Sequence, residues 1–496
     1  MEHTLTVAFT AADVVSGVSY PTILMFLAIV FGFYMAWNIG ANDVANAMAT
    51  SVGSKALTLR RAVVIAAVLE FAGAYFAGAS VSNTIRKGIV DPEIFASEPT
   101  LFVCGMLAAL LAAGTWLLIA SYFGWPVSTT HSIVGAILGF GVAFAGIQAI
   151  YWGKVGTIAA SWVISPVLSG TISYFIFNLI LHKIFHHPRP VEAARRFTPY
   201  MVFVVFTILS MVLVMKGLKY RLKGVDFELW QALLIAGFVG VIAAFISGFL
   251  VRRVAVDDVD GEIEENSARK LYLARALSRA KKHLGRAQGM SSGPVEDEVK
   301  DVLNKVAMLN KSLEQESTAP ANPKSSVWKV ERIFIYLQVI SAGFVAFAHG
   351  SNDVANAIGP MAAAWETIKG GIVGAKAPVS GWFLALGGIA IAIGLATWGW
   401  RVMKTVGTKI TELTPSRGFA AEFGAATTIV IASWLALPIS TTHTLVGAVL
   451  GVGLARGIGA LNLKTVRDVV VSWVVTIPAG AGLAVLFYYM LAGIFA

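Results

Sequence analysis

The sequence contains little charge and a single cysteine. Asp, Glu, Lys and Arg make up only 13% of its 496 residues, whereas 57% are hydrophobic and the mean hydropathy is +0.73. About a quarter of the residues of a soluble domain are charged, so this composition is typical of an integral membrane protein. The lone Cys104 excludes an intrachain disulfide and a cysteine metal site. Redox and thiolate–metal chemistry are therefore not expected.

The chain also lacks a targeting pattern at its start. Residues 1–20 carry Glu2 and Asp13, and they have neither the Arg- and Ser-rich amphipathic pattern of a transit peptide nor the pattern of a cleaved signal sequence. We therefore expect a multi-pass protein of a bacterial inner (plasma) membrane.

Apolar stretches long enough to cross a membrane recur along the whole chain. About twenty residues span the roughly 30 Å hydrocarbon core of a bilayer. Such stretches cover residues 22–37, 62–81, 101–123, 132–150, 155–181, 198–215, 229–251, 333–348, 378–400, 420–437, 444–460 and 466–495. The sequence thus predicts an all-α polytopic membrane protein with about twelve transmembrane helices.

The net charge of +10 is distributed as in a membrane protein. Lys55, Arg60 and Arg61 follow the first apolar stretch, and Arg252 and Arg253 open a long polar loop. Basic residues gather in the cytoplasmic loops of membrane proteins. We therefore expect this loop to be cytoplasmic and both termini to lie outside, and we do not expect nucleic acid as a partner.

The polar stretch 252–331 separates two hydrophobic parts of the chain. Within it, residues 268–288 and 299–313 carry apolar side chains at helical spacing, which predicts amphipathic helices. These helices can pack on each other or on the bundle, or bind anionic lipid or a regulatory partner. The predicted organisation is an external N-terminus (1–21), a first transmembrane repeat (22–185), intervening transmembrane segments (186–251), this loop, and a second repeat (332–496).

Two motifs occur once in each hydrophobic part. Asn-Asp-Val-Ala-Asn-Ala stands at 42–47 and 352–357, and Pro-x-Ser-Thr-Thr-His stands at 126–131 and 438–443. Asp43 precedes Asp353 by 310 residues and His131 precedes His443 by 312, which identifies an internal duplication. Glu70 and Glu422 align approximately in the same comparison. Because the second copy follows a cytoplasmic loop, we predict inverted repeats with a substrate site between them.

The Asn-Asp motif predicts a cation site inside the membrane. A carboxylate at membrane depth is costly unless it meets an ion or lines a wet cavity. The polar run at 38–43 is a poor helix former, so we expect the helix to break here and expose carbonyls. Such oxygen ligands suit Na⁺ or another hard cation, not a transition metal. The candidate cation ligands are Asn42, Asp43, Asn46, Asn352, Asp353 and Asn356.

The Ser-Thr-Thr motif predicts half-helices that bind an oxyanion. Proline followed by Ser and Thr is typical of a helix start, where unpaired N–H groups, the helix dipole and hydroxyls favour an anion. One half-helix from each repeat would surround a tetrahedral anion with neutral donors, although the same residues can also act only as caps. The candidate contacts are Ser128, Thr129, Thr130, Ser440, Thr441 and Thr442.

The charge of the two motifs predicts cotransport. Neither contains Lys or Arg, yet each Asn-Asp motif adds a carboxylate. A phosphate dianion would therefore meet negative charge unless cations bound with it, so anion and cation binding should be coupled. Glu70 and Glu422 are candidates for a further cation site or a proton relay, or they are buried carboxyls bonded to a neighbouring helix.

Three histidines lie in or beside the motifs. His131 and His443 close the Ser-Thr-Thr motifs and can carry a coupling proton or bond to backbone groups. His349, beside the second Asn-Asp motif, has no counterpart, because Ile39 aligns with it. This asymmetric residue can tune access to the site or serve only in packing.

Together these motifs resemble the PiT family of inorganic phosphate transporters, particularly its bacterial and plastid-type branch. The resemblance covers residues 22–181 and 332–490. It implies twelve transmembrane segments in inverted repeats, cation-coupled phosphate uptake and a homodimer. It also implies cation ligands and phosphate contacts at the motif positions given above, and transport-essential roles for Glu70 and Glu422. It implies nothing about residues 252–331.

Several alternatives remain at this level. A sulfate permease would share the architecture, whereas an acceptor for the phosphate proton, such as Asp43 or Asp353, would favour phosphate. Coupling to H⁺, or transport of a metal–phosphate complex, is the alternative to the Na⁺ that the oxygen ligands favour. An intramembrane aspartyl protease also pairs two aspartates, but its Gly-x-Gly-Asp and Tyr-Asp contexts are missing, so we expect neither an enzyme nor a cofactor. A scaffold or sensor acting through residues 252–331 is the last alternative.

Overall fold

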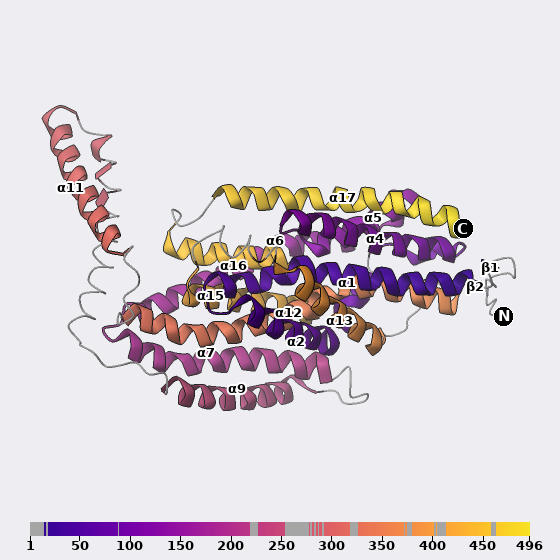
Figure 1. Ribbon diagram of the computed structural model, residues 1–496, viewed down its shortest axis with the longest axis horizontal. Helices are drawn as coiled ribbons and strands as arrows, with labels where there is room; N and C mark the ends of the chain where they lie inside the picture. Colours follow the sequence, from indigo (N-terminus) through magenta and orange to yellow (C-terminus); the bar gives the residue numbers. More distant parts are fainter. Residues whose placement is uncertain are drawn as a thin grey trace. The chain divides into compact units, whose positions relative to one another are not determined.

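The computed structural model is almost entirely helical (Figure 1). It describes residues 14–15, 18–87, 89–218, 227–252, 292–317, 326–371, 373, 379–400, 413–457 and 463–496, together with residue 403 and short stretches between 277 and 289. A small hairpin pairs β1 (Val14–Val15) with β2 (Val18–Ser19). The helices are α1 (Tyr20–Gly53), α2 (Leu59–Ala77), α3 (Ala79–Lys87), η1 (Pro92–Phe95), α4 (Pro99–Phe123), α5 (Thr129–Ala145), η2 (Ile147–Ala149), α6 (Trp152–Ile180), η3 (Leu181–Phe185), α7 (Pro190–Val212), η4 (Leu213–Leu218), α9 (Leu229–Arg252), α11 (Pro294–Ser317), α12 (Ser326–Gly370), α13 (Gly381–Trp398), α15 (Pro415–Trp434), α16 (Thr441–Arg456) and α17 (Leu463–Phe495). The predicted all-α membrane fold is confirmed.

The longer of these helices have the length and composition of membrane spans. Among the described residues, eight helices are long and apolar enough to cross a membrane, or nine if α2 and α3, which meet at 70°, form one span. Each of the twelve predicted apolar stretches overlaps at least one helix. However, α5 and α16 have only 17 and 16 residues, fewer than the about 20 that a full crossing needs. The total of twelve crossings therefore stays a prediction, and α5 and α16 have the length of half-helices.

The two Asn-Asp motifs lie inside continuous helices, so the predicted helix break is wrong. α1 is unbroken from Tyr20 to Gly53, and α12 is unbroken from Ser326 to Gly370. Backbone groups that leave a helix at membrane depth need new hydrogen-bond partners, which are scarce there. Asn42 and Asp43 instead find partners outside α1, and the Asn38 amide donates to the Tyr34 carbonyl of its own helix without breaking it. The motif therefore presents side chains, rather than free carbonyls, to its surroundings.

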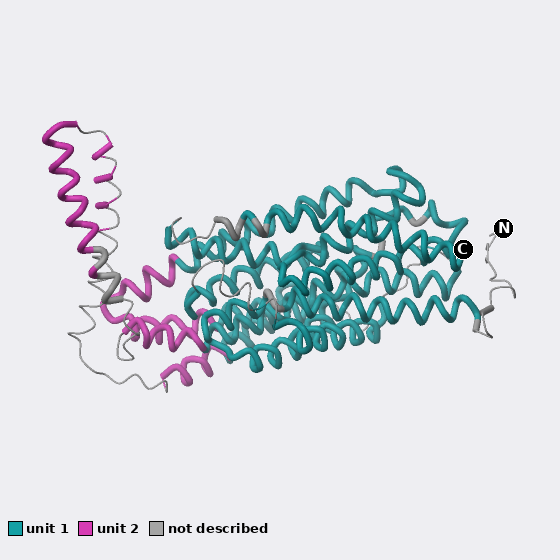
Figure 2. The backbone as a smooth tube through the Cα atoms, turned by 45° about the horizontal axis from the view of Figure 1, so that its top comes forward, with its two compact units in different colours: residues 1–177, 203–242, 336–496 teal, residues 178–202, 243–335 magenta. Residues whose placement is uncertain are grey.

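The chain divides into two compact units (Figure 2). The first unit comprises residues 1–177, 203–242 and 336–496, and within it α1 packs against α13 and α4, α17 packs against α5 and α4, and α2 packs against α13. The second unit comprises residues 178–202 and 243–335 and includes α11. The predicted amphipathic helix 299–313 lies within α11. Of the predicted helix 268–288, residues 268–276 lie outside the described part, and the described residues from 277 to 288 are helical.

Two glycines let the motif helices touch helices of the opposite repeat. Gly40 on α1 lies against the carbonyl oxygen of Ile391 on α13, and Gly350 on α12 lies against that of Glu70 on α2. Neither position has room for a Cβ atom. Each glycine stands three residues before a motif aspartate, so the same packing occurs twice. This makes α13 the counterpart of α2, and Ile391 the counterpart of Glu70.

Candidate functional site

Both Ser-Thr-Thr motifs begin a helix in the interior of the first unit, as predicted. Ser128 caps α5 and Ser440 caps α16, and each hydroxyl accepts the backbone N–H three residues further on at 3.2 Å. Thr129 and Thr441 are the first helical residues, and the side chains of all four residues are buried. Unpaired N–H groups and the positive end of the helix dipole favour negative charge at such positions.

The first asparagine of each Asn-Asp motif anchors the chain that leads into these helices. The Asn42 amide nitrogen donates to the Ser121 hydroxyl at 3.0 Å and to the Trp125 carbonyl oxygen at 3.1 Å. The Asn352 amide nitrogen makes the same two bonds, both at 3.1 Å, to a serine on α15 and to the loop after it. The repeated contacts make α15 the counterpart of α4.

Threonine hydroxyls donate to both motif aspartates. Thr442 donates to Asp43 Oδ1 at 2.5 Å, and Thr441 donates to Asp353 Oδ2 at 2.8 Å. The Thr129 hydroxyl lies between the two carboxylates, 2.8 Å from Asp43 Oδ2 and 3.2 Å from Asp353 Oδ2. A hydroxyl carries one proton, so Thr129 can donate to one aspartate at a time. The two motifs found in the sequence therefore meet in one buried cluster.

The remaining motif residues lie around this cluster. The Asn356 amide nitrogen is 3.2 Å from the hydroxyls of Thr129 and Thr130, and Thr130 donates to the Ile439 carbonyl oxygen at 2.8 Å. The side chain of Asn46 lies outside the described residues, so its predicted role stays a prediction.

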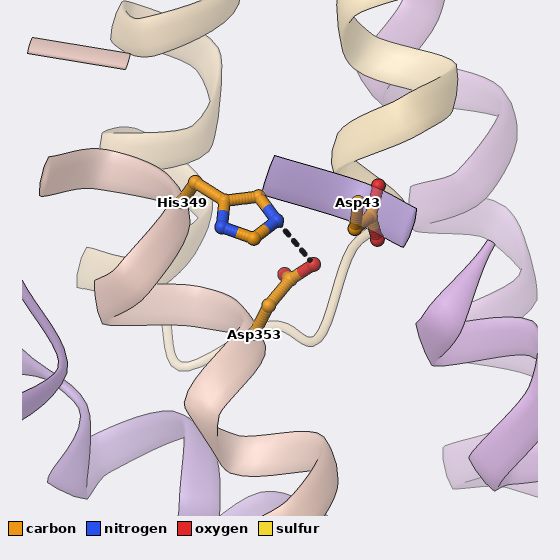
Figure 3. A group of neighbouring side chains, drawn as sticks. All are labelled: Asp43, His349 and Asp353. Carbon is orange, nitrogen blue, oxygen red and sulfur yellow. Dashed lines mark ion pairs between the residues drawn. The ribbon is translucent and has the colours of Figure 1, made fainter. Parts of the chain in front are cut away.

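His349 completes a triad with the two aspartates (Figure 3). Ligand atoms of Asp43, His349 and Asp353 all lie within 4.8 Å of one another, and all three residues are buried. His349 Nε2 lies 3.1 Å from Asp353 Oδ2, and Nδ1 lies 2.9 Å from Glu70 Oε2. Both ring nitrogens therefore face carboxylates. The sequence contained one signal for this contact, because His349 and Asp353 are four residues apart and share a helix face.

Glu422 occupies a separate polar cluster. Its Oε1 accepts from the hydroxyls of Thr50 at 2.7 Å and Ser51 at 2.6 Å and from the Gln338 amide at 3.1 Å, and its Oε2 accepts from the Ser341 hydroxyl at 2.5 Å. Four neutral donors thus surround one fully buried carboxyl. None of these four residues belongs to a repeated motif, and they come from two different helices, α1 and α12.

The proposed alignment of Glu70 with Glu422 is wrong. Glu70 lies on α2, whose counterpart is α13, and the residue in its place is Ile391. Glu422 lies on α15, whose counterpart is α4, and the residue in its place is Leu110. The error arose because similar apolar residues flank both glutamates. Each repeat therefore contributes one acidic residue that the other repeat lacks.

His131 and His443 pack against each other. Their ring centroids are 4.4 Å apart. The His443 ring also stacks on Trp473, and the His131 ring contacts Trp162 at a tilt of 44°. His131 Nδ1 lies 3.4 Å from the Trp473 carbonyl oxygen, and His443 Nδ1 lies 3.4 Å from that of Trp162. Both histidines thus contact backbone, which was the simpler of the two expectations.

Comparison with known proteins identifies the family. The profile of the "Phosphate transporter family" matches residues 39–484. The chain belongs to this family. This transporter is 43% identical over 472 residues to the inorganic phosphate transporter 2-1, chloroplastic, of Arabidopsis thaliana, covering 94% of this chain and 72% of that one. It also resembles a solved structure described as "The sodium-dependent phosphate transporter", with 36% identity, a TM-score of 0.77, and coverage of 95% of this chain and 100% of the other.

Family membership confirms several predictions made from the motifs. The resemblance to phosphate transporters is confirmed, and the protein is a multi-pass membrane transporter and not an enzyme. The aspartyl protease alternative is therefore excluded. The residues of the transporter site, its coupling ion, its orientation in the membrane and its oligomeric state stay predictions.

Proposed function

We propose that this transporter imports inorganic phosphate by symport with a cation, Na⁺ in preference to H⁺, through alternating access around the cluster of Asp43, Asp353 and the two half-helices. The observation that carries this proposal is the hydrogen bonding of the threonines. The hydroxyls expected to bind phosphate donate to the two aspartates.

The proton count of these hydroxyls links the anion to the cation. Each threonine has one proton to donate, so Thr129 or Thr441 can serve either an aspartate or a phosphate oxygen. A buried carboxylate that loses its donor pays a large desolvation cost unless a cation replaces it. Cation binding at Asp43 and Asp353 would therefore release the hydroxyls for phosphate, and phosphate would bind poorly without the cation.

No buried lysine or arginine in the described part of the chain can take the place of that cation. Among the described residues, the buried polar and charged side chains include no Lys or Arg. Carboxylate, amide and hydroxyl oxygens suit a hard cation. We assign the cation ligands to Asp43, Asp353 and the motif asparagines, and a further cation site or proton relay to Glu422, with its four donors. Similarity to a solved sodium-dependent phosphate transporter supports Na⁺ as the coupling ion.

The remaining features of the proposal concern orientation and assembly. Basic residues beside the loop 252–331 support a cytoplasmic loop with both termini outside. The duplicated contacts of Asn42 and Asn352 support two related halves, which we propose to have inverted topology in a homodimer.

Uptake into proteoliposomes tests this function. Purified transporter is reconstituted, Na⁺ and pH gradients are imposed independently, and entry of labelled phosphate is measured with sulfate as a competitor. We expect an inward Na⁺ gradient to drive uptake at constant pH and sulfate to compete poorly. Stimulation by inward protons alone would refute the sodium assignment.

The triad geometry favours a second candidate for the transported species. His349 adds a nitrogen ligand to two carboxylates, which is a donor set that divalent cations also accept. Transport of a metal–phosphate complex with protons would then replace sodium symport. Uptake that continues without Na⁺ and stops when divalent cations are chelated would support this candidate.

A further inference from the structure

The two halves of the site differ in the partners of their aspartates. Each Asp43 oxygen accepts a threonine hydroxyl, Oδ1 from Thr442 and Oδ2 from Thr129. The contacts of Asp353 converge on one oxygen: Thr441, Thr129 and His349 all lie within 3.2 Å of Oδ2. Asp353 Oδ1 is buried and has no hydrogen-bond partner among the described residues.

Two asparagines beside Asp353 also have an unpaired side-chain oxygen. The side-chain oxygens of Asn352 and Asn356 are buried without a hydrogen-bond partner in the described part of the chain. Together with Asp353 Oδ1 they give three unpaired oxygens within about one helical turn of α12. In the first repeat, by contrast, the Asn42 oxygen accepts the Val127 N–H at 3.4 Å.

The two halves of the site also differ at the positions of His349 and Glu70. They pair with each other at 2.9 Å, and both are fully buried or nearly so. The counterparts of this pair are Ile39 and Ile391, which offer no polar group. Among the described residues, a histidine therefore lies beside the motif aspartate on one side of the site only.

We propose that His349, held by Glu70, is a positioning residue that turns Asp353 so that Oδ1 stays unpaired, and that this makes the Asp353 half the first cation site. A cation binds there before phosphate, because its ligands need not give up a hydrogen bond. The Asp43 half becomes available only when phosphate takes the hydroxyls of Thr129 and Thr442. This inference rests on the proposed sodium-coupled function.

Equilibrium binding of radioactive Na⁺ to the purified full-length protein tests the order. The wild type is measured with and without inorganic phosphate. We expect one Na⁺ per chain without phosphate and a second when phosphate is added. Sodium that binds the wild type only together with phosphate would overturn the inference and leave sodium symport intact. Phosphate uptake that ignores Na⁺ would instead overturn the proposed function.

A double substitution tests whether His349 and Glu70 cause the phosphate-independent binding of Na⁺. The double substitution His349→Ile with Glu70→Ile reproduces the pair found in the first repeat. We expect it to weaken the phosphate-independent Na⁺ binding by about tenfold or more, as the loss of one contact to a charged group predicts. Binding as tight as in the wild type would overturn the proposal.

A conservative variant and a control separate positioning from folding. His349→Gln keeps an N–H donor near the position of Nε2, so it should recover most of the phosphate-independent binding even if the double variant folds poorly. Failure of this rescue would also overturn the proposal. Ile39→Leu changes the equivalent position in the other repeat and should retain both binding steps.

Discussion

The hydroxyl of Thr129 offers the sharpest test of the coupling mechanism. It lies between both aspartates, whereas its counterpart Thr441 contacts only Asp353. Thr129→Val removes the hydroxyl with little change of shape. Asp353 keeps Thr441 and His349 when Thr129 is lost, but Asp43 Oδ2 loses the donor at 2.8 Å. Thr129→Val should therefore disturb both carboxylates and Thr441→Val only one.

The expected change in the KM for phosphate can be worked from the loss of one hydrogen bond to a charged carboxylate. Such a hydrogen bond contributes about 1.5–3 kcal/mol, which corresponds to about 10- to 150-fold in affinity. We expect Thr129→Val to raise the KM for phosphate within this range and Thr441→Val to raise it less, with a matching rise in the Na⁺ concentration for half-maximal uptake. Labelled phosphate uptake into proteoliposomes measures both quantities.

A matched substitution controls for the loss of a buried hydroxyl. Thr428 on α15 is also buried, and its hydroxyl donates to the Gly424 carbonyl of its own helix at 2.9 Å. Thr428→Val should leave the KM for phosphate unchanged. Equal effects of Thr129→Val and Thr441→Val, or no effect of either, would refute the shared-hydroxyl reasoning.

Three further predictions concern the motif aspartates, Glu422 and the backbone at Ala436. Asp43→Asn and Asp353→Asn should each abolish uptake while the protein still inserts, as measured by transport and by its amount in the membrane fraction; cation dependence retained in the double variant would contradict the assignment. Glu422→Gln places an amide nitrogen among four donors, so it should raise the Na⁺ requirement for uptake and lower thermal stability in detergent by about 1–3 kcal/mol; a variant that behaves as wild type would remove Glu422 from the mechanism. Ala436 has a left-handed backbone (φ 55°) where the other repeat has Gly124 (φ 66°), so Ala436→Gly should stabilise the protein by about 1 kcal/mol and Gly124→Ala should destabilise it; the opposite order in thermal unfolding would contradict this backbone argument.

Local sequence patterns predicted the helices and the members of the central site. Each long apolar stretch in the sequence corresponds to at least one helix. The proline followed by Ser-Thr-Thr correctly predicted where α5 and α16 begin. The prediction of a helix break at the Asn-Asp motif was wrong because helix propensity takes no account of distant hydrogen-bond partners. Asn42 bonds to Ser121, 79 residues away. Intrinsic propensity is a weak guide when tertiary contacts satisfy the polar groups.

Local sequence patterns could not predict the hydrogen-bond partners of Glu70 and Glu422, for the same reason. Glu422 meets Thr50 and Ser51 across more than 370 residues, and no spacing rule connects such distant segments. A partial signal was present on α1, because Thr50 stands seven residues after Asp43 and shares its helix face. The pairing of His349 with Glu70 needed the packing of α12 on α2, which is seen in the glycine contacts at Gly350 and Gly73 and which no local sequence pattern predicts.

The glycine contacts restrict how this transporter can move between its conformations. Gly40 joins α1 of the first repeat to α13 of the second, and Gly350 joins α12 of the second repeat to α2 of the first. Helix backbones in such close contact cannot slide past one another without a collision. We therefore expect each of these two pairs, α1 with α13 and α12 with α2, to move as one body during transport, so that a rigid body contains helices from both repeats.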